Sequence, residues 1–93
     1  MMVGVLTVEF AVLGARSLKD KRRVLVSVKQ RLRNRFNVSV AEVEFHDMPK
    51  RCRLALAMVS NEARALHSQL DLMVELMRRA PGLSLLDYQR ELF

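Results

Sequence analysis

The sequence has few of the residues that mark metal-binding, disulfide-bonded or secreted domains. Its 93 residues include one cysteine, two prolines, three glycines and no tryptophan. The single Cys52 cannot close an intrachain disulfide, and the two separated histidines, His46 and His67, do not complete a metal-ligand set with it. We therefore expect no metal and no cofactor, and this cysteine usage fits a reducing cytosol.

The chain also lacks the segments that separate domains or direct a protein to a membrane. It has no Pro-, Ser- or Gly-rich linker, no low-complexity tract and no internal repeat, which predicts one domain over residues 1–93. The apolar stretch from Met1 to Leu13 is interrupted by Thr7 and Glu9 and is too short to span a bilayer. We interpret it as a strand and expect a cytoplasmic protein with no membrane partner.

Hydrophobic periodicity predicts six elements in the order strand, helix, strand, strand, helix, strand. The strands are expected at 3–13, 38–45, 53–60 and 83–93, the first helix at 18–35, and the second between a cap at Ser60 or Asn61 and a stop at Pro81. This order is that of the α+β ferredoxin-like fold, in which four antiparallel strands carry both helices on one face.

Alternation along the strands predicts which side chains face the helices. The inward sets are Leu6, Val8, Phe10 and Val12; then Ala41, Val43 and Phe45; then Leu86, Tyr88 and Leu92. The same alternation places the acidic side chains on the open face of the sheet, namely Glu9, Glu42, Glu44, Asp87 and Glu91. We therefore expect an acidic open sheet and a basic helical side.

Three blocks of sequence carry a family resemblance. They are Ser17 to Arg23 (SLKDKRR), Asn34 to Val43 (NRFNVSVAEV) and Val59 to Asn61 (VSN). Together they resemble the YlxP-like family of small bacterial proteins of unknown function. The resemblance implies a ferredoxin-like fold and a bacterial cytosolic protein. It also implies a gene neighbourhood of transcription and translation factors, which favours RNA or the ribosome as a partner, and it supplies no catalytic residues.

Positive charge is concentrated in the first predicted helix. Nine of the sixteen lysines and arginines lie between Arg16 and Arg35, opposed only by Asp20, so this segment carries +8 and the remaining residues sum to −2. Clustered cations attract phosphates and release their counterions, which favours a polyanion such as RNA. The competing interpretation is a solvated helix whose charges only keep the protein soluble.

The expected interface follows one broad face of that helix, with help from the loop before the third strand. Its residues are Arg16, Lys19, Arg22, Arg23, Lys29 and Arg33, assisted by Lys50 and Arg51 if these face the same way. Arg31 and Arg35 flank the apolar stripe from the other side. Lys21 lies within that stripe, and we expect it to form a structural ion pair.

The open sheet offers an alternative function. Its central positions hold Val5, Thr7, Glu9, Ala55, Ala57 and Val59, without the aromatics that stack bases on RNA-recognition sheets. Exposed small apolar side chains favour a protein partner that packs on this face, most simply a second copy of the same chain. The alternative is therefore a homodimeric structural or regulatory protein-interaction module that binds no nucleic acid.

Catalysis has little support in the sequence, and we expect no enzyme. Cys52, His46 and His67 show no arrangement of nucleophile and base. Arg16 with Asn61 faintly resembles the residue pair of small ferredoxin-like hydrolases of acyl phosphates. The turn from Gly14 to Lys19 could hold one anion at the helix N-terminus, although ordinary capping by Ser17 is the simpler interpretation.

Overall fold

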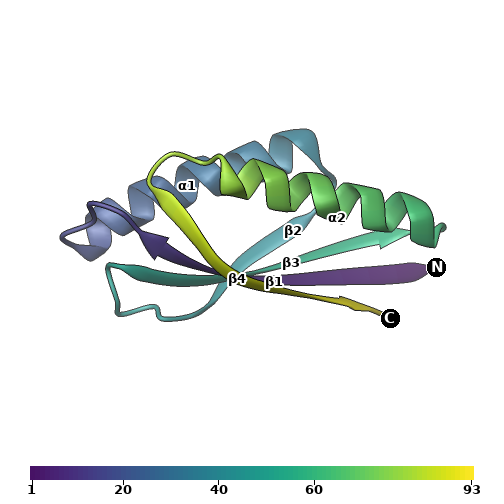
Figure 1. Cartoon of the computed structure of the whole chain (residues 1–93), viewed down its shortest axis with the longest axis horizontal. Coiled ribbons are helices and arrows are strands. Elements are labelled where there is room, and N and C mark those ends of the chain that lie inside the picture. The colour runs from purple at the N-terminus through teal and green to yellow at the C-terminus, as the bar shows by residue number, and fades with distance from the viewer.

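Six elements follow one another in the predicted order in a computed structural model that describes residues 1–93. They are β1 (Met2–Val12), α1 (Leu18–Arg35), β2 (Ser39–Glu44), β3 (Arg51–Ser60), α2 (Ala63–Arg78) and β4 (Leu83–Leu92). The strands form one antiparallel sheet in the order β2-β3-β1-β4. Both helices cover one face of this sheet (Figure 1), so the expected ferredoxin-like fold is confirmed.

The hydrophobic core lies between the helices and the two central strands. The fully buried side chains there include Leu6, Val8 and Phe10 of β1, Leu54 and Leu56 of β3, Leu32 of α1, and Leu66, Leu70 and Met77 of α2. Burying a side chain of this size stabilises the fold by about 1.5–3 kcal/mol. Neither helix has the length and hydropathy of a membrane-crossing segment.

The alternation expected for β2 is wrong. Val40 is buried and Ala41 is exposed, so Glu42 lies on the helix side, where it pairs with Lys21. A register shift between Glu42 and Glu44 then returns Glu44 to the open face opposite Arg53. Such a bulge inserts one residue and reverses the alternation beyond it. The open sheet therefore lacks one of its five expected carboxylates.

The inward set expected for β4 is also partly wrong, again because of a bulge. Asp87 pairs with Glu9 and Leu85 pairs with Phe10, which leaves Leu86 without a partner in the register. Leu85 packs against the core, whereas Leu86 is 49% exposed. An extra residue in one strand of an antiparallel pair shifts every following side chain to the other face.

Candidate nucleic-acid interface

The start of α1 is capped by its own side chains. The backbone N–H of Asp20 donates to Oγ of Ser17 at 3.1 Å, and the backbone N–H of Arg16 donates to Oδ2 of Asp20 at 3.0 Å. This reciprocal arrangement satisfies two donors that a helix N-terminus otherwise leaves free. The capping interpretation is confirmed, and the Asp20 carboxylate bonds one backbone N–H of the turn where an external anion was considered.

Most cations of the first helical segment have no acidic partner. Of the nine between Arg16 and Arg35, only Lys21 lies within 4.0 Å of a carboxylate oxygen. The cations that do form ion pairs elsewhere are Arg51, Arg53, Arg78, Arg79 and Arg90. Positive charge is therefore neutralised over much of the molecule but not on α1.

The predicted interface residues of α1 are mostly exposed. Arg16, Lys19, Arg22, Arg23 and Arg33 are exposed, and Lys29 is half-buried. Arg33 donates one hydrogen bond to the backbone oxygen of Val40 at 3.1 Å, which fixes the end of its side chain beside β2. A guanidinium has five N–H donors, so this contact leaves Arg33 able to bind a phosphate.

The structure separates the two loop cations that were expected to assist. Lys50 lines a surface hollow with Gly14, Ala15 and Arg16, so it extends the cationic surface beyond the start of α1. Arg51 instead lies on the open face of the sheet, where it forms an ion pair with Glu9. It is therefore on the opposite side of the sheet from the helix.

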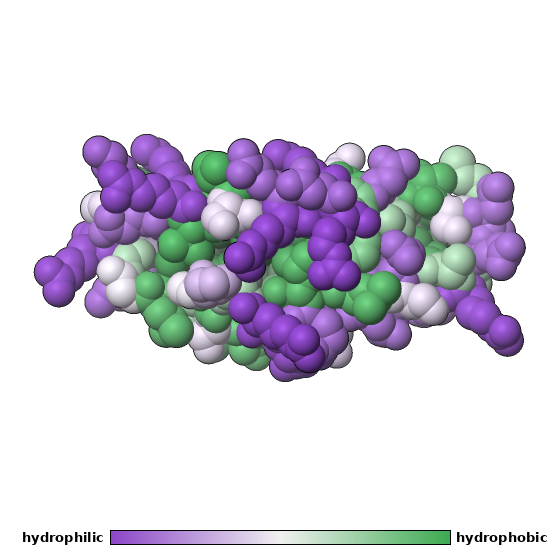
Figure 2. Space-filling model, turned by 90° about the horizontal axis from the view of Figure 1, so that it is seen from above, coloured by the Kyte–Doolittle hydropathy of each residue, from purple (hydrophilic) through white to green (hydrophobic).

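The helical layer presents a largely hydrophilic surface to solvent. Viewed from above, hydrophilic side chains cover most of this layer, and hydrophobic patches appear between them (Figure 2). Val26 of α1 and Leu72 of α2 are the large apolar residues on the helices that stay about half exposed, at 55% and 48%. The candidate interface, which we call the α1 cationic surface, consists of Arg16, Lys19, Arg22, Arg23, Lys29, Arg33 and Lys50.

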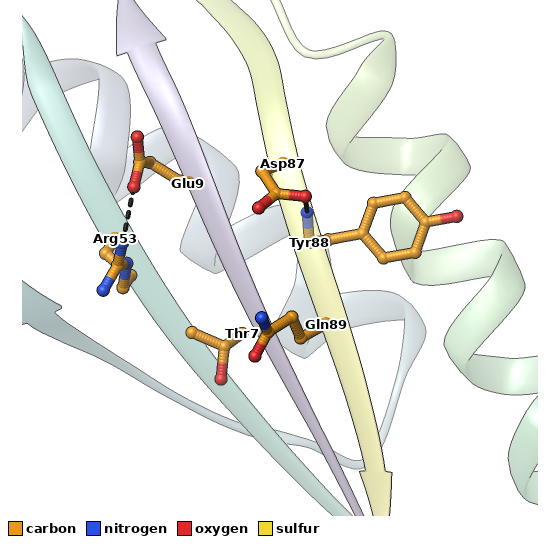
Figure 3. A pocket seen from close by; sticks show the side chains of 6 residues that line it. All are labelled: Thr7, Glu9, Arg53, Asp87, Tyr88 and Gln89. Carbon is orange, nitrogen blue, oxygen red and sulfur yellow. Dashed lines mark hydrogen bonds and ion pairs between the residues drawn. The ribbon is translucent and has the colours of Figure 1, made fainter.

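The open face carries a network of ion pairs around a small polar hollow of about 100 Å³. Arg53 reaches Oε1 of Glu9 at 2.6 Å (Figure 3), and it also pairs with Glu44. The hydrogen bond from Arg53 holds the pKa of Glu9 below its ordinary value, and the same bond raises the pKa of Arg53. Asp87 and Gln89 complete the hollow, whereas the Tyr88 ring points to the other side of β4.

This network makes the open face less acidic than expected, since Arg51 and Arg53 oppose its four carboxylates. Both guanidiniums also lie over the ring of Phe45, at 5.3 and 5.4 Å from its centroid. Phe45 reaches them through a left-handed backbone conformation with φ of 66°. It therefore does not join the inward set that was expected for β2.

The other half of the open face is apolar. Val5, Ala41, Ala55 and Ala57 line a shallow depression of about 220 Å³, and Val59 nearby is 60% exposed. The depression has no charged lining residue, so it provides neither phosphate contacts nor stacking platforms for RNA.

The titratable residues considered for catalysis remain apart. Burial raises the pKa of the fully buried Cys52 thiol to about 12. His46 contacts the backbone oxygen of Glu42, and His67 contacts Arg90. No three His, Cys, Asp or Glu side chains gather as a metal site.

The pair that resembled an acyl phosphate hydrolase is not assembled either. Asn61 follows Ser60, which pairs with Met2 at one end of the sheet. Arg16 follows the opposite end, where Ala11 pairs with Arg51.

The fold creates a second cationic feature on the helical side. Arg31, Asn34 and Arg35 of α1 line a groove of about 400 Å³ with Leu76 and Arg79 from the end of α2. The sequence places Arg31 and Arg35 beside the apolar stripe but does not indicate that the C-terminal ends of the two helices meet. We call this feature the arginine groove.

Two comparisons of the sequence with known proteins give matches. The sequence pattern of a family described as "Protein of unknown function (DUF503)" matches residues 3–90. The chain is 38% identical over 60 residues to the uncharacterized protein YlxP of Bacillus subtilis (strain 168); the match covers 64% of this chain and spans 65% of the length of that relative.

Two designed proteins share its architecture. The de novo designed protein Foldit4 superposes with a TM-score of 0.56 at 7% identity, covering 100% of this chain and 97% of its own. The de novo designed protein Ferredog-Diesel gives a TM-score of 0.52 at 12% identity, covering 96% and 83%. At these identities the likeness concerns the fold alone.

Proposed function

Because this chain belongs to the DUF503 family, which is described only as of unknown function, its role has to be argued from its surface, and we propose that it binds RNA. The α1 cationic surface would engage the phosphate backbone without catalysis. The partner is RNA, free or within the ribosome, as the YlxP-like resemblance implied, and the setting is the cytoplasm.

The observation that carries this proposal is the lack of acidic partners on α1. Of the nine cations from Arg16 to Arg35, eight have none, whereas five cations elsewhere are paired. The helix even places like charges four residues apart, in Lys19 with Arg23, Lys29 with Arg33 and Arg31 with Arg35. Each such pair destabilises a helix by a few tenths of a kcal/mol. An anionic ligand would convert this repulsion into attraction.

The chemistry of the surface also defines the mode of binding. Lysines and arginines on a convex helix contact phosphates, which position a nucleic acid but do not read its sequence. The α1 cationic surface contains no aromatic side chain to stack bases. We therefore propose binding that depends on charge and is largely independent of sequence.

Salt dependence tests the proposal directly. Binding of a fluorescein-labelled single-stranded RNA, followed by anisotropy, should weaken with salt, with a log–log slope of about −3 to −4 if about five phosphates are engaged. Replacing Arg22, Lys29 and Arg33 together by Gln should weaken binding and flatten the slope. Equal affinity and slope in this variant and the wild type would show that α1 is not the interface.

A matched control removes the same charge from other elements. Arg64→Gln, Arg78→Gln and Arg90→Gln take three cations from α2 and β4. This variant should retain most of the affinity if position matters, and circular dichroism should show that both triple variants remain folded. An equal loss of RNA affinity in both triple variants would indicate that binding depends only on the net charge of the protein.

The apolar half of the open face favours a second candidate function, self-association. The molecule measures 42 × 21 × 18 Å, and the helices stack on the sheet along the intermediate axis (Figure 1). The open face therefore has a footprint of about 750 Å², similar to the roughly 800 Å² per partner of a standard interface. The face also carries both acidic and basic groups, Glu9 and Arg53 among them, so a second copy complements it in charge.

Sedimentation equilibrium tests this alternative. If the wild type is a dimer, Val59→Lys should convert it to a monomer, and Leu72→Lys on α2 should leave the dimer intact. This result would support association through the open face. A monomeric wild type at high micromolar concentration would contradict it. Since α1 lies on the other side of the sheet (Figure 1), this result is independent of RNA binding.

A further inference from the structure

The arginine groove has the features of a binding site for one nucleotide. Three guanidinium-bearing residues from two helices, Arg31, Arg35 and Arg79, surround it together with the amide of Asn34 and the apolar side chain of Leu76. We propose that this groove holds a nucleotide, its phosphate on the guanidiniums and its base between a guanidinium plane and Leu76. The proposal rests on the proposed RNA-binding function and assigns a subsite to it.

Positive charge at the groove exceeds what its surroundings neutralise. Glu75 is the acidic residue beside it, and this carboxylate already pairs with Arg78 at 3.5 Å and with Arg79 at 3.7 Å. Arg31 and Arg35 have no carboxylate within 4.0 Å. A phosphate bound between them would supply the missing negative charge and accept paired N–H donors.

Helix ends account for part of this charge and not for all of it. The C-terminus of a helix carries about half a negative charge and favours cations in its last turn. Arg33 and Arg35 occupy that turn in α1, and Arg78 occupies it in α2. Arg79, the cap residue of α2, also lies at a helix end, whereas Arg31 lies before the last turn of α1. The guanidinium of Arg31 therefore remains in excess of the helix ends.

The lining of the groove suits a base as well as a phosphate. Its volume of about 400 Å³ falls in the range of small-molecule sites, roughly 300–1,000 Å³. Guanidinium planes stack on RNA bases, and an amide such as that of Asn34 can donate to and accept from a base edge. The α1 cationic surface has no such combination of groups. The groove is therefore where base contacts are expected.

The groove is also continuous with the α1 cationic surface. The last turn of α1 carries Arg33 on the side of β2, where it bonds to Val40, and Arg35 on the side of α2, where it lines the groove. Asn34 lies between them in the chain. An RNA strand that crosses the last turn of α1 would contact both surfaces with consecutive nucleotides.

Titration with a mononucleotide tests the inference without a polyanion. Adenosine 5′-monophosphate added to the wild-type protein should give saturable NMR shifts of the Nε–H signals of Arg31, Arg35 and Arg79. Inorganic phosphate should bind the same site at least threefold more weakly, because it has no base to stack. Equal affinity for the two probes would overturn the base contact, and non-saturable shifts on all exposed arginines would overturn the site.

Variants separate the groove from the rest of the helix. Arg31→Gln with Arg35→Gln should weaken adenosine monophosphate binding at least tenfold, whereas the control Arg64→Gln with Arg90→Gln should leave it nearly unchanged. If both double variants bind like the wild type, the groove is not the site. Heteronuclear spectra of each variant establish that the fold is intact.

The same titration distinguishes this inference from the proposed function. Loss of RNA binding in the variant of Arg22, Lys29 and Arg33, with nucleotide binding retained, supports two separate surfaces. If the wild-type protein binds the nucleotide but binds no RNA, the proposed function is contradicted. The ligand of the groove would then be a free mononucleotide. RNA binding without nucleotide binding would overturn the groove alone.

Discussion

The ammonium of Lys21 lies 2.7 Å from a carboxylate oxygen of Glu42, although Lys21 is only 2% exposed. The same ammonium donates to the backbone oxygens of Phe45 at 2.7 Å and Met48 at 2.9 Å. One side chain of α1 therefore holds both β2 and the loop after it. This loop includes Phe45, whose backbone conformation is left-handed, and it leads to Lys50.

Replacing Lys21 by Met should destabilise the protein by about 3–5 kcal/mol, because it leaves a poorly solvated carboxylate and two carbonyls without their partner. Urea unfolding followed by circular dichroism measures this loss as a lower midpoint. Lys19→Met at an exposed site two residues away should change stability by less than about 0.5 kcal/mol. A Lys21→Met midpoint equal to that of the control would contradict a structural role for the pair.

The double variant Lys21→Met with Glu42→Leu should recover part of that stability. A buried ion pair costs desolvation, and replacing both partners by apolar groups is often neutral or stabilising. Lys21 also holds two carbonyls, so recovery should be incomplete. The double-mutant cycle isolates the coupling between the two side chains.

Cys52 should react with thiol reagents only when the protein opens. Its side chain is fully buried and its pKa is raised to about 12 from an ordinary value of 9.0. The reactive thiolate is therefore much less populated than in the unfolded chain at neutral pH. Stopped-flow labelling with a disulfide reagent in water and in urea compares the two states. Native labelling as fast as unfolded labelling would mean that the thiol is accessible.

Much of the fold follows from local sequence signals. The strand and helix periods gave the element order, and α1 spans the predicted residues because Ser17 and Asp20 cap its start. The ion pair of Lys21 was also predictable, because a cation within an apolar stripe needs a partner. The identity of Glu42 as that partner was not predictable. Regular alternation puts Glu42 and Glu44 on the same face, whereas the bulge between them puts them on opposite faces.

The candidate sites were less predictable than the fold. The cations of the α1 cationic surface share one helix, so their common face follows from a period of 3.6 residues. The arginine groove depends on where α1 and α2 meet, which brings Arg31 of one helix and Leu76 of the other to the same groove although they are 45 positions apart in the sequence. Arg51 was expected to assist only if it faced the helix side. The third strand begins at Arg51 instead of at the predicted Arg53, and its alternation places Arg51 on the open face.

Glu9 should contribute to stability in a pH-dependent manner. Its hydrogen bond with Arg53 lowers its pKa in the folded state below the ordinary value of 4.5. A group with a lowered folded pKa stabilises the protein above its unfolded pKa, and this contribution is lost as pH falls through the folded value. Glu9→Gln should therefore be less stable than the wild type at pH 6, with the difference shrinking below about pH 4.5.

Urea midpoints measured from pH 6 to pH 3 compare the two proteins. Asp47→Asn, in the exposed loop before β3, serves as the control and should follow the wild type. A difference between Glu9→Gln and the wild type that stays constant over this range would show that the ion pair does not contribute through its charge.

Gly4 marks a close approach between β1 and α2. A Cβ built on Gly4 would lie 3.0 Å from Cγ and Cδ1 of Leu66, which is fully buried. Gly4→Ala should therefore overpack this contact and destabilise the protein by about 1–3 kcal/mol. Thermal unfolding of the variant measures this loss.

A second background shows whether the contact with Leu66 is the cause. In Leu66→Ala, which itself should cost about 2–5 kcal/mol through the cavity it leaves, the extra methyl of Gly4→Ala has room. There the Gly4 substitution should become neutral or stabilising, since alanine also restricts the unfolded chain more than glycine does. An equal cost in both backgrounds would place the strain in the backbone of β1 instead of at Leu66.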